Sequence, residues 1–180
     1  MQPSLNSNLT PVLSSDRIIL RGWQDNDFHP YTTLVSDSVL MHFIGGGAMS
    51  YEEAREDFDS MREQWIDRQI GIFAIADKTS DELLGFTGLF ESPLIDEPEL
   101  SWSLFAKNHG KGYASEAAIL ARDWAFREHN IGPLMSLVHP DNISSKRVAE
   151  RLGATVESHS TWMGQPRLVY RHITLGEVID

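Results

Sequence analysis

The stretch His109-Gly110-Lys111-Gly112-Tyr113-Ala114 decides how the rest of the chain is interpreted. Its two glycines stand at alternate positions, between a strand-like run and a helix-like run. A loop that opens directly into a helix presents unpaired backbone N–H groups at the positive end of the helix dipole, where phosphate binds. Lys111 adds a positive charge beside those groups. We therefore predict a phosphate-binding loop, although such turns also carry glycine for purely conformational reasons.

Alternating strand and helix patterns flank this loop on both sides. We expect a strand at Glu99 to Leu104 before it and another at Leu134 to Val138 after it. A helix is predicted from the loop to His129, and a second from Asn142 to Leu152, which Gly153 ends. The first helix has a face of small residues that can lie close to a sheet: Ala114, Ala117, Ala118, Ala121 and Ala125.

The sequence of the N-terminal half predicts two helices and three strands. Asp25 and Asp27 can cap a helix that extends to Val35, and Ser50 with Glu53 forms a capping box for a helix that extends to about Arg68. The remaining strands are expected at 17–21, 71–76, 83–90, 154–158 and 167–174. This order predicts an α/β domain with a mixed, mostly antiparallel sheet of about seven strands and about four helices.

The composition is that of one globular domain without metal or disulfide support. The chain has 180 residues, no cysteine and a formal net charge of −11, which makes nucleic acid an unfavourable partner. The seven histidines form no cluster with ligand spacing, so we expect no metal site. No segment has the apolar length of a membrane span, and we expect a cytoplasmic protein with residues 1–15 as a loose lead-in to a domain at 16–180.

The glycine loop resembles the phosphate loop of the GNAT acetyltransferase superfamily. That loop reads Gln/Arg-x-x-Gly-x-Gly/Ala, and the present sequence departs from it only at His109. The following Ser115-Glu116-Ala117 resembles the RimJ/RimL branch, which acetylates N-termini of ribosomal proteins. Further segments match this family in the same order along the chain. They are Leu20-Arg21 with Asp25 and Asp27, residues 99–102, residues 142–148 and residues 152–154.

The resemblance implies that acetyl-CoA binds in a cleft between two splayed parallel strands, here 99–104 and 134–138. Asn142 would then bind the pantetheine arm, although the residue could equally be a helix N-cap. Ser145 would stand near the thiol. The full set of cofactor-binding residues that the resemblance implies is Leu104, Phe105, Ala106, His109, Gly110, Lys111, Gly112, Tyr113, Ala114, Asn142 and Ser145.

The implied reaction is direct attack of a neutral amine on the thioester, without a covalent acyl-enzyme. Glu99 is the preferred general base. The alternative interpretation is that Glu99 is simply an exposed residue at the start of a strand. Ser145 is the candidate acid, since no tyrosine occurs between Leu134 and Leu152. A backbone N–H near Trp102 could polarise the acetyl carbonyl if the strand bulges there.

The acceptor is expected to be a primary amine, with a protein or peptide N-terminus favoured because an α-amino group titrates near 8 and a lysine near 10.4. Polyamines, antibiotics and amino acids stay open as acceptors, as does a noncatalytic acyl-CoA-binding or sensing domain. A nucleotide-binding module is a weaker alternative, and the protein could be a monomer or a homodimer. Four aromatic residues are candidates for the acceptor pocket, of which we expect two to line it: Phe43, Phe90, Trp102 and Trp162.

Overall fold

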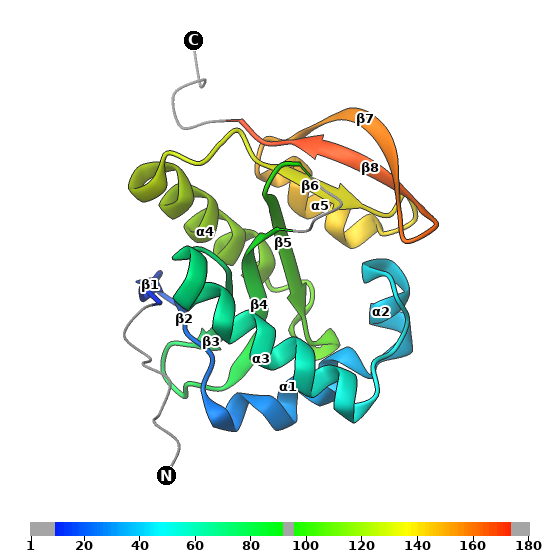
Figure 1. Ribbon diagram of the computed structural model, residues 1–180. Helices are drawn as coiled ribbons and strands as arrows, with labels where there is room; N and C mark the ends of the chain where they lie inside the picture. Colours follow the sequence, from blue (N-terminus) through cyan, green and yellow to red (C-terminus); the bar gives the residue numbers. More distant parts are fainter. Residues whose placement is uncertain (1–9, 92–95, 174–180) are drawn as a thin grey trace.

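The computed structural model describes residues 10–91 and 96–173, and its strands form one sheet in the order β1-β2-β3-β4-β5-β6-β8-β7 (Figure 1). All neighbouring strands are antiparallel except β5 and β6. The predicted mixed, mostly antiparallel sheet is therefore confirmed. The strands are β1 (Leu13–Ser14), β2 (Ile18–Arg21), β3 (Ile72–Asp77), β4 (Leu83–Phe90), β5 (Glu99–Leu104), β6 (Met135–Val138), β7 (Thr155–Trp162) and β8 (Gln165–Arg171).

The described residues contain five α-helices and eight strands, which is one helix and one strand more than the sequence predicted. The additional strand, β1, has two residues, and the additional helix, α2, has seven, so neither is long enough to show a periodic pattern. The predicted capping box is confirmed, because Ser50 accepts from Glu53 N while the Glu53 carboxylate accepts from Ser50 N. The helices are α1 (Phe28–Val35), α2 (Ser38–Ile44), α3 (Tyr51–Arg68), α4 (Tyr113–His129) and α5 (Ile143–Arg151), with 3-10 turns at Asp25–Asp27 and Ala106–Asn108.

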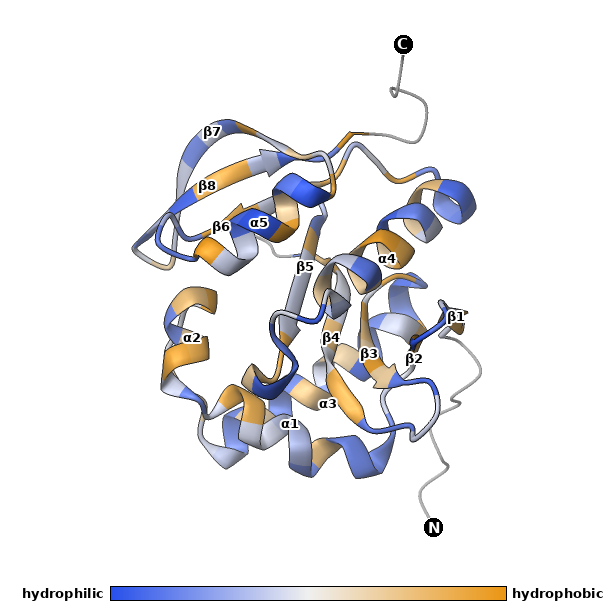
Figure 2. Cartoon of the chain, turned by 180° about the vertical axis from the view of Figure 1, so that it is seen from behind, coloured by the Kyte–Doolittle hydropathy of each residue, from blue (hydrophilic) through white to orange (hydrophobic). Residues whose placement is uncertain are grey.

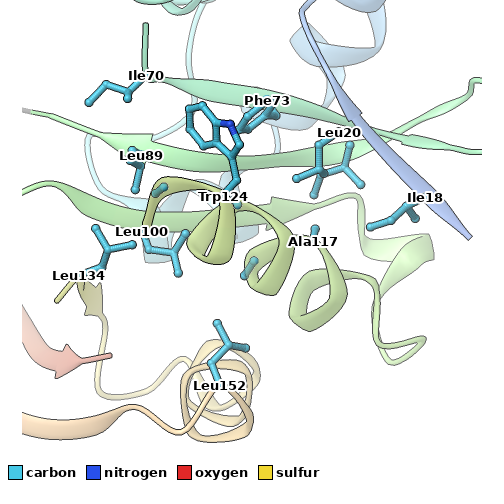
Figure 3. Packing of buried hydrophobic residues seen from close by; sticks show 14 of the residues in the cluster. Ile18, Leu20, Ile70, Phe73, Leu89, Leu100, Ala117, Trp124, Leu134 and Leu152 are labelled. Carbon is cyan, nitrogen blue, oxygen red and sulfur yellow. The ribbon is translucent and has the colours of Figure 1, made fainter. Parts of the chain in front are cut away.

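Helices cover both faces of the sheet and bury two main cores. The alanine face of α4 packs on one face, where Trp124 meets the ring of Phe73 edge to face with centroids 5.4 Å apart (Figure 3). On the other face, α1 and α3 bury a second cluster, in which the ring centroids of Phe58 and Trp23 lie 5.2 Å apart. Burying a large apolar side chain stabilises by roughly 1.5–3 kcal/mol, so these two layers hold the central strands in place.

The C-terminal part of the chain forms a third, smaller core. There α5 packs on β6 and β8 through Ala149, Val138 and Tyr170. The turn at Met163 and Gly164, both with positive φ, joins β7 to β8, and this hairpin tip lies beside α2 in both views (Figures 1 and 2). The hairpin and α2 are far apart in sequence, and together they border one side of the site.

The parallel strands β5 and β6 diverge soon after they meet. Their register contains a single pair, Glu99 with Met135. By contrast, β4 and β5 pair continuously from Phe90 with Glu99 to Gly85 with Leu104. The edge of β5 that faces β6 is therefore open along most of its length, as expected for a splayed parallel pair.

Candidate active site

A cleft of about 1250 Å³ opens where β5 and β6 separate. Its lining comes from β5 and β6, the starts of α4 and α5, one side of α3, the end of α2 and the tip of the β7–β8 hairpin. The cleft therefore joins the predicted phosphate loop to the predicted acceptor wall. It offers space for both a long cofactor and a second substrate.

Side chains, rather than backbone pairs, link the two strands at the base of the cleft. Glu99 Oε1 accepts a hydrogen bond from Leu137 N at 3.1 Å, and Ser136 Oγ donates to Leu100 O. Because the hydroxyl hydrogen is used in that bond, His172 Nε2 must donate to Ser136 Oγ over their 2.8 Å separation. Burial lowers the pKa of His172 to about 4, so the ring is neutral at physiological pH. These contacts hold the strands apart at a defined distance.

The open edge of β5 offers backbone groups to a ligand. Successive residues of a strand direct their peptide groups to opposite sides, so Trp102 faces the same edge as Leu100 and Leu104. Leu104 O contacts His109 Nε2 at 3.0 Å, and Phe105 N donates to Leu84 O at 3.1 Å. The Phe105 N–H is thus already paired, and its carbonyl accepts from Asn108 N at 2.8 Å, so only the second lone pair of that oxygen is left for the predicted main-chain contact.

The expected bulge at Trp102 or Ser103 is absent, because the β4–β5 register shows no shift. Instead, β4 approaches β5 closely at Gly85, where an added Cβ would lie 2.1 Å from Ser103 O. A bulge was the condition on which a backbone N–H near Trp102 or Ser103 could polarise the acetyl carbonyl, and this condition is not met. The strand edge remains regular along β5.

The glycine loop has the backbone geometry that phosphate binding requires. Gly110 has φ +75° and Gly112 has φ +85°, a conformation that favours glycine, and α4 begins at Tyr113. The first N–H groups of α4 are therefore available to an anion. His109, the residue that departs from the family pattern, anchors the loop to the end of β5 through Leu104 O.

Two buried hydroxyls fit a polar ligand in the cleft. Ser103 Oγ and Ser115 Oγ are both buried and have no hydrogen-bond partner in the part of the chain that the structure describes. Both residues line the cleft, one on β5 and the other in the first turn of α4. Buried polar atoms normally have partners. The residues present therefore suit a cofactor with a phosphate and a polar arm, such as acetyl-CoA.

Arg17, on the loop before β2, is a site residue that the sequence did not indicate. Its Nη1 donates to Lys111 O at 3.0 Å, its Nε donates to Glu116 Oε2 at 2.9 Å, and its guanidinium lies 4.7 Å from the centre of the Tyr113 ring. Arg17 also forms an ion pair with Glu116, which offsets a negative charge near the loop. No sequence signal connects these positions, because they meet only in the folded chain.

Asn142 and Ser145 lie at the start of α5 and line the cleft. Asn142 Oδ1 accepts from Ser145 N at 3.0 Å, which confirms the N-cap interpretation. The amide nitrogen of Asn142 is not needed for that cap. The residue can therefore cap the helix and donate to a ligand at once.

Glu99 lies at the point where the two strands separate, on the cleft wall. Burial raises its pKa to about 7, while the N–H of Leu137 and the charge of Arg167 oppose that shift. The alternative of an exposed glutamate is therefore wrong. A carboxyl group with this pKa is partly ionised at neutral pH, which suits a general base.

All four predicted aromatic residues line the cleft, rather than the two that we expected: Phe43, Phe90, Trp102 and Trp162. Phe90 and Trp162 meet edge to face with centroids 6.5 Å apart, and Phe43 lies 5.8 Å from the ring of His139. Opposite them, α3 contributes Glu53, Glu56 and Asp57 to the lining. The acceptor side is thus aromatic on one wall and acidic on the other.

Neither a metal centre nor a spanning helix is found in residues 10–91 and 96–173. No group of three or more His, Cys, Asp or Glu side chains there could hold a metal ion. Within the same ranges, every helix is too short or too polar to cross a bilayer.

The cleft suits transfer of an acyl group from a phosphate-bearing thioester to a nucleophile that a carboxylate deprotonates, which is the chemistry of acyl-CoA-dependent N-acyltransferases. The family model described as acetyltransferase (GNAT) domain matches residues 17–155. An uncharacterized protein of Bacillus subtilis, YkkB, is 30% identical over 172 residues, which cover 91% of this chain and 96% of that protein. The chain therefore belongs to the GNAT family of N-acetyltransferases.

Solved structures share the whole fold. An acetyltransferase from Agrobacterium tumefaciens is 32% identical, with a TM-score of 0.82 over 91% of this chain and 95% of that one. RimL, a ribosomal L7/L12 α-N-protein acetyltransferase in complex with coenzyme A, has 18% identity and a TM-score of 0.77 over 91% of this chain and 98% of its own. As a member of the GNAT acetyltransferase family, this chain uses acetyl-CoA as the acetyl donor.

Proposed function

We propose that this enzyme transfers the acetyl group of acetyl-CoA directly to an α-amino group, with Glu99 as the general base and Ser145 as the general acid. The observation that carries this proposal is the position of Glu99. Its carboxyl group lies buried where β5 and β6 separate, and its pKa is raised to about 7. A general base works best with a pKa near the operating pH.

The proposed step begins with a neutral amine on the acceptor side of the cleft. The nitrogen lone pair forms a bond to the acetyl carbon, the carbon–sulfur bond breaks, and the electron pair of that bond goes to sulfur. Glu99 takes the proton that leaves nitrogen, and the hydroxyl of Ser145 gives a proton to the sulfur. Both side chains then regain their starting state by proton exchange with solvent.

The pKa of Glu99 favours an α-amino acceptor. An α-amino group titrates near 8 and a lysine amine near 10.4, so a base with a pKa of about 7 is much better matched to the former. A peptide N-terminus carries such a group, and the α-amine of a free amino acid, although more basic because its carboxylate is ionised, is still less basic than a lysine amine. Removing a proton from a lysine amine would need more assistance than this carboxylate provides.

The test measures release of free CoA thiol with a panel of N-terminal peptides, amino acids, polyamines and aminoglycosides, with CoA binding measured in parallel. Glu99→Gln keeps the shape and an acceptor for the Leu137 N–H. We expect it to bind CoA normally and to lose about 10²–10⁴-fold in turnover. Ser145→Ala tests the acid in the same way.

The outcomes separate the competing functions. Full turnover by Glu99→Gln would show that another group is the base. Tight CoA binding without turnover on any amine would instead identify a noncatalytic acyl-CoA-binding domain.

A further inference from the structure

Arg167 on β8 is a buried cation on the acceptor side of the cleft. Its side chain is one of the largest fully buried side chains among the described residues, and the residue as a whole is 2% exposed. Nη1 donates to Pro166 O at 2.9 Å, and Nη2 donates to Ile44 O, at the end of α2, at 3.2 Å. Both acceptors are neutral carbonyl groups. Among the described residues, no carboxylate forms an ion pair with this guanidinium.

A buried charge without a partner is costly, so its presence calls for a further ligand. A guanidinium carries five N–H donors in a planar fork, and the two carbonyls use two of them. Burial lowers the pKa of Arg167, but an arginine stays protonated in proteins. Three N–H groups are therefore left over on a residue that lines the cleft. Their geometry matches a carboxylate.

Arg167 and Glu99 together present opposite charges to the same part of the cleft. Leu137, whose N–H donates to Glu99, pairs with Val169, two residues along β8 from Arg167, so the two side chains lie in the same region. Both residues line the cleft, and no direct ion pair joins them. An amino acid carries its amine and its carboxylate on one carbon, so it can place the first at Glu99 and the second at Arg167.

The segment from Gly45 to Gly47 follows Ile44, whose carbonyl accepts from Arg167. A Cβ at Gly45 would lie 3.3 Å from Arg167 Nη2, and at Gly47 no atom lies within 4 Å of the Cβ position. Gly45, Gly46 and Gly47 all have positive φ, which favours glycine there. The segment thus covers the cation without placing a side chain against it.

We propose that the acceptor of this enzyme is a free amino acid, whose carboxylate binds Arg167 and whose apolar side chain packs against the pair formed by Phe90 and Trp162. The inference rests on the proposed function and names its substrate class. A polyamine lacks the carboxylate, and the N-terminal residue of a peptide has an amide in its place.

The acidic residues of α3 are a weaker guide to the substrate than Arg167. Glu53 and Glu56 are exposed, where water and salt screen their attraction for a second ammonium group, and the half-buried Asp57 already accepts a hydrogen bond from the Tyr31 hydroxyl. Arg167 is buried, so its preference for an anion is screened much less. The buried charge therefore decides between a carboxylate-bearing acceptor and a polycation.

The first experiment uses the wild-type enzyme and needs no variant. Phenylalanine, tryptophan, methionine and leucine are each supplied as the free acid, the primary amide and the decarboxylated amine, and thiol release from acetyl-CoA is measured. We expect kcat/KM for the best free acid to exceed that of its amide by about 100-fold. The amide has the less basic amine, so ionisation alone would favour it.

The second experiment removes the cation. Arg167→Met should lower kcat/KM for the free acid by about 100-fold, chiefly through KM, and leave the amide within about threefold. Arg167→Lys should restore part of the selectivity, because it keeps the charge but loses the fork. Arg171→Met is the matched control on the same strand, since Arg171 pairs with Glu97 and Glu157 and does not line the cleft.

Equal use of acid, amide and amine by the wild type would overturn the inference but leave the acetyltransferase proposal intact. Selectivity retained by Arg167→Met, with an unchanged melting temperature and CoA affinity, would overturn it as well. No thiol release with any amine would instead contradict the proposed function itself.

Discussion

Arg17 Nη1 donates to Lys111 O at 3.0 Å, although the two residues are 94 positions apart. The carbonyl of Lys111 and the N–H of Gly112 point in opposite directions because the peptide bond between them is planar and trans. By holding the carbonyl toward β2, Arg17 leaves that N–H directed away from the strand. The glycine loop is thus positioned from outside as well as by its own sequence.

Arg17→Ala is expected to weaken CoA binding by about 2- to 12-fold, the range of one net hydrogen bond, with little change in kcat. Isothermal titration with CoA measures this effect. Arg55→Ala is the control, because Arg55 is also half-exposed and paired with an acidic residue, Asp59, but its other contacts are with aromatic rings of the α1–α3 core and not with the glycine loop. Unchanged affinity of the Arg17 variant would show that the loop keeps its conformation unaided.

The pH dependence of kcat/KM should follow the ionisation of Glu99. The ionised carboxylate is the active form, so activity should rise with pH through an apparent pKa of about 7, and it should rise again as the acceptor amine loses its proton near pH 8 or above. Stopped assays from pH 5.5 to 9 with one acceptor determine this profile. An acid limb that persists unchanged in the residual activity of Glu99→Gln would assign the ionisation to another group.

Glu99 should also make stability depend on pH. Its pKa in the folded state, about 7, lies above the ordinary value of 4.5, so the folded state binds the proton more tightly. Its contribution is therefore fully present below about pH 4.5 and is lost as the pH rises through 7. We expect Glu99→Gln to gain about 1–3 kcal/mol relative to wild type between pH 5 and pH 8. Urea unfolding at both pH values measures the difference, and a constant difference would contradict it.

Two variants of Asn142 can separate its capping from its binding role. Asn142→Ala should reduce the free energy of unfolding by about 1 kcal/mol, because the cap to Ser145 N is lost. Asn142→Ser should retain most of that stability, since serine is also a good N-cap. If CoA affinity falls in both variants, the amide binds the cofactor. Normal affinity in the serine variant would leave capping as its role in this enzyme.

Local patterns predicted most of the elements that position the cofactor. The bounds of β5 were predicted as they occur, and α4 ends at His129, as predicted. The capping box at Ser50 also determined the start of α3. These features depend on residues close in sequence, so periodicity and capping chemistry suffice. The sequence did not indicate β1 or α2, because a strand of two residues and a helix of seven are too short to produce a periodic pattern.

By itself, the sequence determined the α/β class, the family, the phosphate loop and the candidates Glu99, Asn142 and Ser145. Only the tertiary structure decided that Glu99 is buried, that β5 has no bulge and that Arg17 and Arg167 belong to the site. The physical reason is that burial and charge depend on which distant segments pack together. Ile44 and Arg167, which meet 123 residues apart, show this most directly, because neither position carries a local signal of the other.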